Sequence, residues 1–151
     1  MAYWRLHYHA VWTCKNRQPL ITTEIEASLH KYLRNKGAEF GGIMHAVGGI
    51  ENHVHIVFSL PPKISIADFI GKLKGASSHF VTHILQNQSE FDWQRGYGVF
   101  SFNDGAMTKI IAYALNQKEH HHKNTIRASF EKWSEEDDGV CVYRDENSAP
   151  W

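Results

Sequence analysis

The order in which its apolar segments follow one another is the feature that most limits how this chain of 151 residues can fold. Runs rich in aromatic and β-branched residues, typical of strands, alternate with runs whose apolar residues recur every three or four positions, typical of amphipathic helices. The expected strands span residues 3–13, 42–47, 53–60 and 98–102, and the expected helices span 22–37, 65–87 and 103–121. This β-α-β-β-α-β order, with a last helix after it, is that of the ferredoxin-like (split βαβ) plan. We therefore expect an α+β fold with an antiparallel sheet, two helices on one of its faces, and the other face free for a ligand or a partner.

Capping and turn residues set the expected boundaries. Ser65 is placed to cap the second helix, and Asn103 or Asp104 to cap the third. Gly48 and Gly49 are a turn signal between the second and third strands. The second and third strands are therefore expected to form an antiparallel pair joined at these glycines.

The distribution of charge divides the chain. Residues 1–125 hold 13 lysines and arginines against 9 acidic residues, a balance of +4, whereas residues 126–151 hold 3 against 7, a balance of −4. We expect one domain over 1–125 and an acidic C-terminal extension over 126–151. Binding to phosphates needs a basic surface, and the mildly basic residues 1–125 can supply one although the formal net charge of the chain is zero. The net charge therefore does not exclude a nucleic-acid partner.

No segment has the character of a membrane span or a signal peptide. Apolar runs such as Ile56–Leu60 are far shorter than the roughly 18 residues that a membrane span needs. The two cysteines, Cys14 and Cys141, have no C-x-x-C spacing, which argues against a zinc site or a disulfide framework. A cytoplasmic protein with reduced thiols and no membrane partner is the expectation.

Two pairs of histidines have the spacing of a metal site on a strand. His53 and His55 flank Val54 and therefore point to the same face of the third expected strand, where both imidazoles can bind one metal ion. A strand that shows two histidines to solvent or to hydrogen-bond partners would look the same. His7 and His9 have the same spacing on the first strand, and spacing does not separate the two pairs.

The remaining histidines are open to simpler interpretations. His79 and His83 lie four residues apart on the second helix, but no H-E-x-x-H glutamate stands between them, which favours surface or groove histidines. His120, His121 and His122 come at the end of the last helix, where positive charge interacts favourably with the helix dipole.

Tyr113 and Gln117 are four residues apart on the last expected helix. They project from one face, about 6 Å apart along the helix axis. Taken alone, this spacing is typical of an amphipathic helix with a buried tyrosine.

Several segments in order resemble the HUH tyrosine transposases of the Insertion Sequence 200 type, with the REP-associated tyrosine transposases among them. The resemblance covers about residues 5–122. It is carried by residues 9–17 (HAVWTCKNR), 48–57 (GGIENHVHIV), 73–78 (LKGASS), 93–98 (WQRGYG) and 113–117 (YALNQ). Agreement of several motifs in order and in spacing is much more specific than any one of them.

The resemblance implies a transposase that cleaves and rejoins single-stranded DNA through a 5′-phosphotyrosine intermediate. By this resemblance Tyr113 is the nucleophile, and His53, His55 and Gln117 hold a divalent metal ion, Mg²⁺ or Mn²⁺. Asn52 stands where many relatives have aspartate, which puts a carboxylate partner for the first histidine in doubt. The relatives recognise DNA hairpins at palindromic element ends. The resemblance implies a homodimer, in which each tyrosine helix of the insertion-sequence enzymes completes the partner's metal site, whereas some REP-associated relatives are similar to monomers; whether the site forms within one chain or across two stays open.

Basic and aromatic side chains near these motifs are the candidates for DNA contact. The basic side chains would bind phosphates, and Trp93 or Tyr97 would stack on unpaired bases, although either ring fits a protein core as well. The candidate phosphate contacts are Lys15, Arg17, Lys72, Lys74 and Arg95.

Two other functions fit parts of the pattern. A non-catalytic module could bind single-stranded nucleic acid on its sheet like an RNA-recognition motif, but the K/R-G-F/Y-G/A-F-V-x-F/Y signature is missing. A metal hydrolase with an activated water would need the histidine pair but not Tyr113.

Overall fold

A four-stranded antiparallel sheet forms the centre of the molecule. The structure, a computed structural model, describes residues 2–85 and 90–123. The strands are β1 (His7–Thr13), β2 (Ile43–Ile50), β3 (His53–Ser59) and β4 (Gly98–Phe102), in the order β2-β3-β1-β4. The helices are α1 (Thr23–Glu39), α2 (Ile66–His79), α3 (Met107–Leu115) and α4 (Gln117–Lys123), with short turns η1 (Lys15–Arg17), η2 (Phe80–Ile84) and η3 (Asp104–Ala106). The α+β, ferredoxin-like plan is confirmed.

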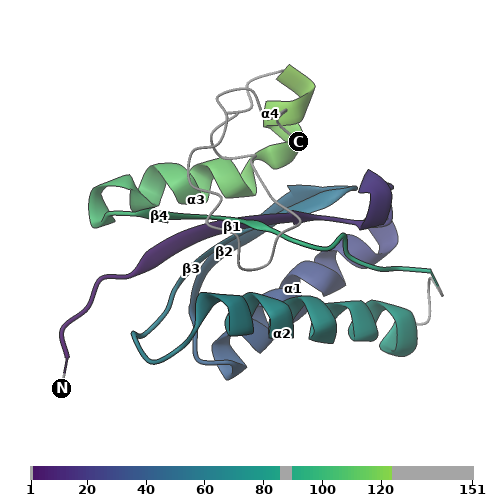
Figure 1. Ribbon diagram of the computed structural model, residues 1–151. Helices are drawn as coiled ribbons and strands as arrows, with labels where there is room; N and C mark the ends of the chain where they lie inside the picture. Colours follow the sequence, from purple (N-terminus) through teal and green to yellow (C-terminus); the bar gives the residue numbers. More distant parts are fainter. Residues whose placement is uncertain (1, 86–89, 124–151) are drawn as a thin grey trace.

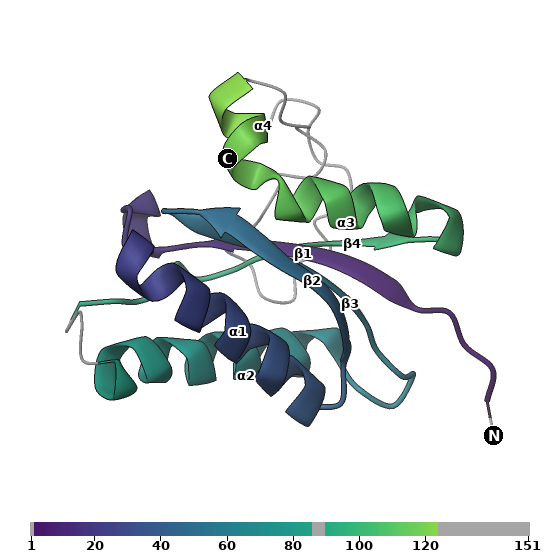
Figure 2. The same cartoon turned by 180° about the vertical axis from the view of Figure 1, so that it is seen from behind.

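Helices lie on both faces of the sheet. Figures 1 and 2 show α1 and α2 side by side on one face, and α3 and α4 over the other. The expectation that one face is free is therefore wrong in part, because α3 packs on β2 and β3. As a result β3, a central strand, is buried along its whole length.

The main core lies between the sheet and the pair α1 and α2. The helix α1 contributes Ile25, Leu29 and Leu33, which recur every four residues and so face the sheet together. From the strands, alternate residues such as Trp12 and Phe58 point into the same layer. The β3 residues between these core residues point to the opposite face of the sheet, toward α3 and α4.

A close backbone approach fixes the position of α3 on the sheet. A small apolar cluster of Ala46, Val57, Ile110 and Ala114 joins α3 to β2 and β3. A Cβ added at Gly48 would lie only 1.8 Å from the carbonyl oxygen of Ala114. Glycine at this point of β2 therefore allows the last turn of α3 to touch the strand.

The start of β1 and the end of β2 differ from the expected boundaries. The first strand begins at His7 rather than at residue 3, because His7 pairs with Ser59 and Phe102, where both neighbouring strands end. The expected turn at Gly48 and Gly49 is wrong, since both glycines lie within β2. The turn consists of Glu51 and Asn52 instead.

The second and third helices also depart from a single continuous helix. After His79, α2 passes into the π-helical turn η2, and the expected end near residue 87 lies outside the described residues. The last helix was expected to be continuous over 103–121, but Asn116 (φ −102°, ψ 28°) leaves helical geometry and separates α3 from α4. The acidic extension 126–151 lies outside the described residues, so the domain boundary near 125 stays a prediction.

Across residues 2–85 and 90–123, every helix is too short or too polar to pass through a lipid bilayer.

Candidate active site

The two histidines of β3 face the side of the sheet that α3 and α4 cover. Val54 and Ile56 belong to the core beneath α1 and α2, so the alternation of the strand sends His53 and His55 to the opposite face. Both rings are buried, with 1% of His53 and none of His55 exposed. Buried imidazoles need polar partners, and those partners define the site.

Asn52 orients the ring of His53. The Nδ1 of His53 lies 2.7 Å from the Oδ1 of Asn52, and because an amide oxygen only accepts, Nδ1 carries the proton and donates it. In a neutral ring the lone pair is then on Nε2. The sequence had left in doubt which group would orient His53, and in the structure the amide oxygen of Asn52 does so.

Gln117 brings an oxygen to the same point. Its Nε2 donates to the carbonyl oxygen of Tyr113 at 3.0 Å, so its Oε1 faces the sheet and lies 3.4 Å from the Nε2 of His53. Two atoms with lone pairs therefore face one another in a buried space, an arrangement that a shared cation would stabilise.

Tyr113 packs directly on the histidines of its own chain. The centre of its ring lies 5.7 Å from that of His55 and 6.2 Å from that of His9, both in edge-on contact. Only 4% of Tyr113 is exposed. The phenol and the histidine pair thus lie in one cluster without the help of a second subunit.

The histidines of β1 separate into two roles that spacing alone did not distinguish. The Nε2 of His9 lies 2.7 Å from the Nδ1 of His55, which places His9 in the same cluster. His7 lies farther along the strand, bonded to the Ser59 hydroxyl at 2.6 Å and to the Asp104 carboxylate.

Two histidines of α4 complete the surroundings of the site, and the sequence interpretation had missed them. The ring of His120 lies 4.7 Å from that of Tyr113, and the ring of His121 lies 5.0 Å from that of His53. The signal was present in the spacing, since Gln117 and His121 are one helical turn apart and share a face. The break at Asn116 hid how α4 is directed.

Burial keeps the inner imidazoles neutral. It lowers the pKa of His55 to about 3, helped by the neighbouring His121 and His120 and opposed by the Gln117 side chain, which favours the charged ring. Burial, together with His55, also lowers the pKa of His9 well below its usual value. Since a metal ion binds only the neutral ring, these nitrogen atoms are in the form that a metal needs.

His79 and His83 take no part in this cluster. Their rings are 4.5 Å apart on α2 and η2, and both side chains are exposed. They belong to the helical layer on the other face of the sheet (Figure 2).

The loop after β1 carries two of the candidate DNA contacts. Lys15 and Arg17 are exposed in η1, and the backbone nitrogen of Cys14 donates to the carbonyl oxygen of Asn52 at 2.8 Å. This bond fixes the loop beside the turn that leads into His53. Both cations therefore lie at the end of the sheet that carries the histidine site.

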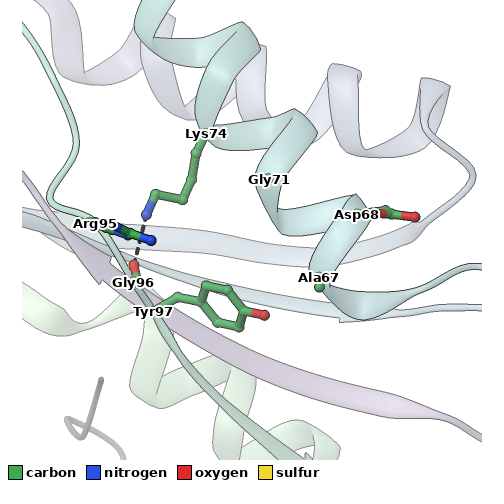
Figure 3. A pocket seen from close by; sticks show the side chains of 7 residues that line it. All are labelled: Ala67, Asp68, Gly71, Lys74, Arg95, Gly96 and Tyr97. Carbon is green, nitrogen blue, oxygen red and sulfur yellow. Dashed lines mark hydrogen bonds between the residues drawn. The ribbon is translucent and has the colours of Figure 1, made fainter. Parts of the chain in front are cut away.

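Two of the other candidate DNA contacts, Lys74 and Arg95, line a separate cavity of about 350 Å³. Figure 3 shows Lys74 reaching from α2 toward Gly96, with Arg95 and Tyr97 beside it. The ammonium of Lys74 donates to the carbonyl oxygens of Gln94 and Gly96, at 2.7 Å each, and so holds this segment against α2. Lys72 and Arg95 are exposed. The cavity lies on the α2 side of the sheet, so these residues do not converge on the histidines.

Trp93 is a core residue rather than a stacking surface for bases. Only 6% of it is exposed, its indole nitrogen donates to the Ser77 hydroxyl at 2.9 Å, and its ring packs edge-on against Trp12. Of the two aromatic candidates, only Tyr97 lines an open surface.

Within the described residues, no three His, Cys, Asp or Glu side chains are grouped to hold a metal ion. The predicted set of ligands is of another kind, because its third member is the amide of Gln117.

The fold and the site together define a tyrosine transposase of the HUH class: a histidine pair on a central strand of a ferredoxin-like sheet, with a tyrosine helix packed over it. Comparison with known proteins agrees. The family model "Transposase IS200 like" matches residues 2–117, and the chain belongs to this family of transposases.

Individual relatives support the same assignment. The chain is 27% identical to the ISDra2 transposase TnpA of Deinococcus radiodurans, over 76% of this chain and 85% of that protein. It is 29% identical to the transposase for insertion sequence element IS200 of Salmonella typhimurium, over 77% and 79% of the two chains.

Solved structures show the same fold. A Deinococcus radiodurans protein assigned as a transposase superposes with a TM-score of 0.61 at 25% identity, covering 75% of this chain and 92% of that one. A REP-associated tyrosine transposase bound to a REP hairpin superposes with a TM-score of 0.58 at 13% identity, covering 83% and 76%.

Proposed function

We propose that this transposase cuts single-stranded DNA with the phenol of Tyr113 and keeps one end as a 5′-phosphotyrosine ester. The single observation that carries the proposal is the contact of the Tyr113 ring with His55, 5.7 Å between centres, beside the paired acceptors of His53 and Gln117. A nucleophile and a candidate metal site thus lie in one buried cluster.

The proposed step is a displacement at phosphorus. The phenolic oxygen of Tyr113 forms a bond to the phosphorus, the bond from phosphorus to the 3′ oxygen breaks, and the phenol proton is released while the 3′ oxygen takes up a proton. A phenol, with a pKa of about 10, ionises more readily than an alcohol and is also a better leaving group. The ester therefore keeps the energy that a later 3′-hydroxyl needs to rejoin the strand.

His53, His55 and Gln117 are the proposed ligands of a divalent metal ion. Their donor atoms fit such an ion, because Asn52 fixes the proton of His53 on Nδ1 and the amide oxygen of Gln117 points at the Nε2. Bound there, Mg²⁺ or Mn²⁺ would stabilise the charge on the phosphoryl oxygens. Two nitrogen donors favour Mn²⁺ over Mg²⁺.

The proposed DNA partner is a single strand with a hairpin, as at palindromic element ends. A fold neighbour is bound to a REP hairpin, and in this chain Lys15 and Arg17 are exposed in η1, next to Cys14, whose backbone is bonded to Asn52 at the turn before His53. Lys72, Arg95 and Tyr97 offer a second contact region on the α2 side, with Lys74 holding its backbone in place.

A homodimer stays a prediction. Because Tyr113 already touches His9 and His55 of its own chain, a partner subunit is not needed to bring these groups together.

DNA can reach Tyr113 only if α4 moves. The phenol is almost fully buried, with His120 against its ring. One exposed ion pair, between Lys118 and Glu26 at 2.7 Å, ties α4 to α1, and such pairs contribute little stability. We propose that the part of α4 beyond Gln117 turns to admit the strand, so that His120 leaves the phenol while Gln117 stays at the site.

The arrangement argues against the two other functions. A sheet that binds bases as an RNA-recognition motif does needs an open face, but here α3 and α4 cover the histidine side. A hydrolase that uses water would have no need for a tyrosine packed against its metal ligands.

The test is a covalent trap with two labels. The protein is incubated with Mn²⁺ and a hairpin oligonucleotide from the DNA flanking its gene, labelled at the 5′ or the 3′ end. The 3′ label should enter an adduct that survives denaturation, while the 5′ label leaves with a free 3′-hydroxyl. Tyr113→Phe should abolish the adduct and retain DNA binding, and Tyr32→Phe, on α1, should form it normally. Cleavage by Tyr113→Phe at the parent rate would contradict the proposal.

A further inference from the structure

His9 stands behind His55, one of the two histidines among the proposed metal ligands. In the antiparallel pair of β1 and β3, His9 lies opposite Val57 and His55 opposite Val11. His9 and His55 are thus diagonal neighbours on one face, a separation that long side chains bridge. Their rings do so, with the Nε2 of His9 lying 2.7 Å from the Nδ1 of His55.

The direction of this hydrogen bond decides what His55 can do. If His9 donates, the proton of His55 is on Nε2, the atom nearer the proposed metal, and the ring cannot be a ligand there. If His55 donates from Nδ1, its Nε2 carries the lone pair that a ligand needs. His53 is already held in this second form by the Asn52 oxygen.

We propose that His9 is a positioning residue: its Nε2 accepts the Nδ1 proton of His55 and so turns the Nε2 of His55 toward Gln117 as a metal ligand. The inference rests on the proposed metal site. Metal-bound histidines almost always donate their other N–H to an acceptor, commonly a carboxylate, a carbonyl or water. Here the two acceptors are a neutral amide for His53 and a neutral imidazole for His55.

The surroundings of His9 suit this role. Only 1% of the residue is exposed, so water does not replace it as the acceptor. The rings of Phe100 and Tyr113 pack against it, with centres 6.3 and 6.2 Å away, and hold its plane. His9 thus contacts both Tyr113 and His55, the proposed nucleophile and a proposed metal ligand.

Three substitutions separate the acceptor from the ring shape. His9→Phe keeps an aromatic ring but removes the acceptor, whereas His9→Gln places an amide oxygen close to the position of Nε2. His7→Phe is the matched control, because His7 lies on the same strand and face but is bonded to Ser59 and Asp104.

The first readout is Mn²⁺ affinity by titration calorimetry, without DNA. His9→Phe should weaken binding about 10- to 100-fold, the range found when an orienting partner is removed. His9→Gln and His7→Phe should stay within about threefold of the parent. Equal affinity of His9→Phe and the parent, or absence of Mn²⁺ binding by the parent, would overturn the inference.

The second readout is the proton itself, and it is measured in the parent protein. In ¹⁵N-labelled parent protein loaded with diamagnetic Zn²⁺, the shared proton should show its one-bond coupling to Nδ1 of His55, with His55→Gln used for assignment. A one-bond coupling to Nε2 of His9 would overturn the inference. A protein that binds metal as described but forms no Tyr113 adduct would contradict the proposed function and leave the role of His9 intact.

Discussion

The Nε2 of His53 and the Oε1 of Gln117 lie 3.4 Å apart although 64 residues separate them in the chain. Each atom is turned toward the other by a bond on its far side, from His53 to Asn52 and from Gln117 to the carbonyl oxygen of Tyr113. The second bond joins the metal site to the tyrosine across the break at Asn116, from the first residue of α4 to the last turn of α3. Metal binding and the position of the nucleophile are therefore expected to depend on each other.

Gln117 is expected to contribute directly to metal affinity. Gln117→Ala removes one of three ligands and should weaken Mn²⁺ binding by at least the roughly 10- to 100-fold that loss of an outer partner causes. Gln117→Glu places a carboxylate there and should bind Mn²⁺ more tightly than the parent. Titration calorimetry measures both. Glu119→Gln, an exposed neighbour on α4, is the control, and a Gln117→Ala protein with the parent's affinity would remove Gln117 from the site.

The glycine beneath α3 is expected to be indispensable for packing. At Gly48 a Cβ would lie 1.8 Å from the Ala114 carbonyl oxygen, so Gly48→Ala should lower the free energy of unfolding by about 1–3 kcal/mol, as overpacking does. It should also weaken Mn²⁺ binding, because α3 must lift from the sheet. Urea unfolding and calorimetry test the two effects.

Gly75→Ala is the matched control for this substitution. Nothing lies within 4 Å of a Cβ at Gly75, in the middle of α2, so the change should raise stability by about 0.5–1 kcal/mol. Equal stability of the Gly48→Ala protein and the parent would show that α3 does not rest on β2 as described.

Stability of the metal-free protein should fall as the pH is lowered below 6.5. The pKa of His55 is depressed from 6.5 to about 3, so between these values the unfolded chain binds a proton that the folded protein does not. The contribution is complete above pH 6.5 and decreases by about 1.4 kcal/mol per pH unit below it. At pH 5 the loss from His55 is about 2 kcal/mol.

Urea unfolding in the presence of a chelator, at pH 7.5, 6 and 5, measures this dependence. His55→Gln should show a shallower loss of stability than the parent. His122→Gln, which changes an exposed histidine, should follow the parent at each pH. Parallel curves for His55→Gln and the parent would mean that His55 is not buried in neutral form.

Arg95 and Lys72 are expected to bind phosphates, whereas Lys74 acts on the fold. Arg95→Ala and Lys72→Ala should each weaken binding of a hairpin oligonucleotide. Each should also make the slope of log affinity against log salt concentration shallower by about 0.7, the value for one phosphate contact on a single strand. Fluorescence anisotropy over a range of salt concentrations gives these slopes. Lys31→Ala, an exposed cation on α1, is the control. Slopes unchanged in both variants would place the DNA elsewhere.

The sequence predicted the elements of the site better than its geometry. Strand alternation predicted that His53 and His55 share a face, and helical spacing predicted the same for Tyr113 and Gln117, but the family resemblance selected these four residues. The turn was misplaced because Gly48 makes room for α3, which packs on it, and local turn preference does not contain this tertiary contact.

Spacing relates His121 to Gln117, but it could not place His9, His120 or His121 beside the site, for a different reason. The role of His9 depends on the register between β1 and β3, which sets His9 diagonally from His55. The role of the α4 histidines depends on the break at Asn116, which redirects the chain after Tyr113. Both are relationships between elements, and a periodic pattern describes only one element at a time.

The most direct test of the central claim is to locate the DNA on the protein. Trypsin cuts after Lys109 and Lys118 and releases residues 110–118, a peptide whose only tyrosine is Tyr113. After reaction with Mn²⁺ and the hairpin oligonucleotide, nuclease and trypsin digestion followed by mass spectrometry should find a 5′-phosphonucleotide on this peptide. A nucleotide on any other peptide, or a cleaved strand with no nucleotide on the protein, would contradict the account.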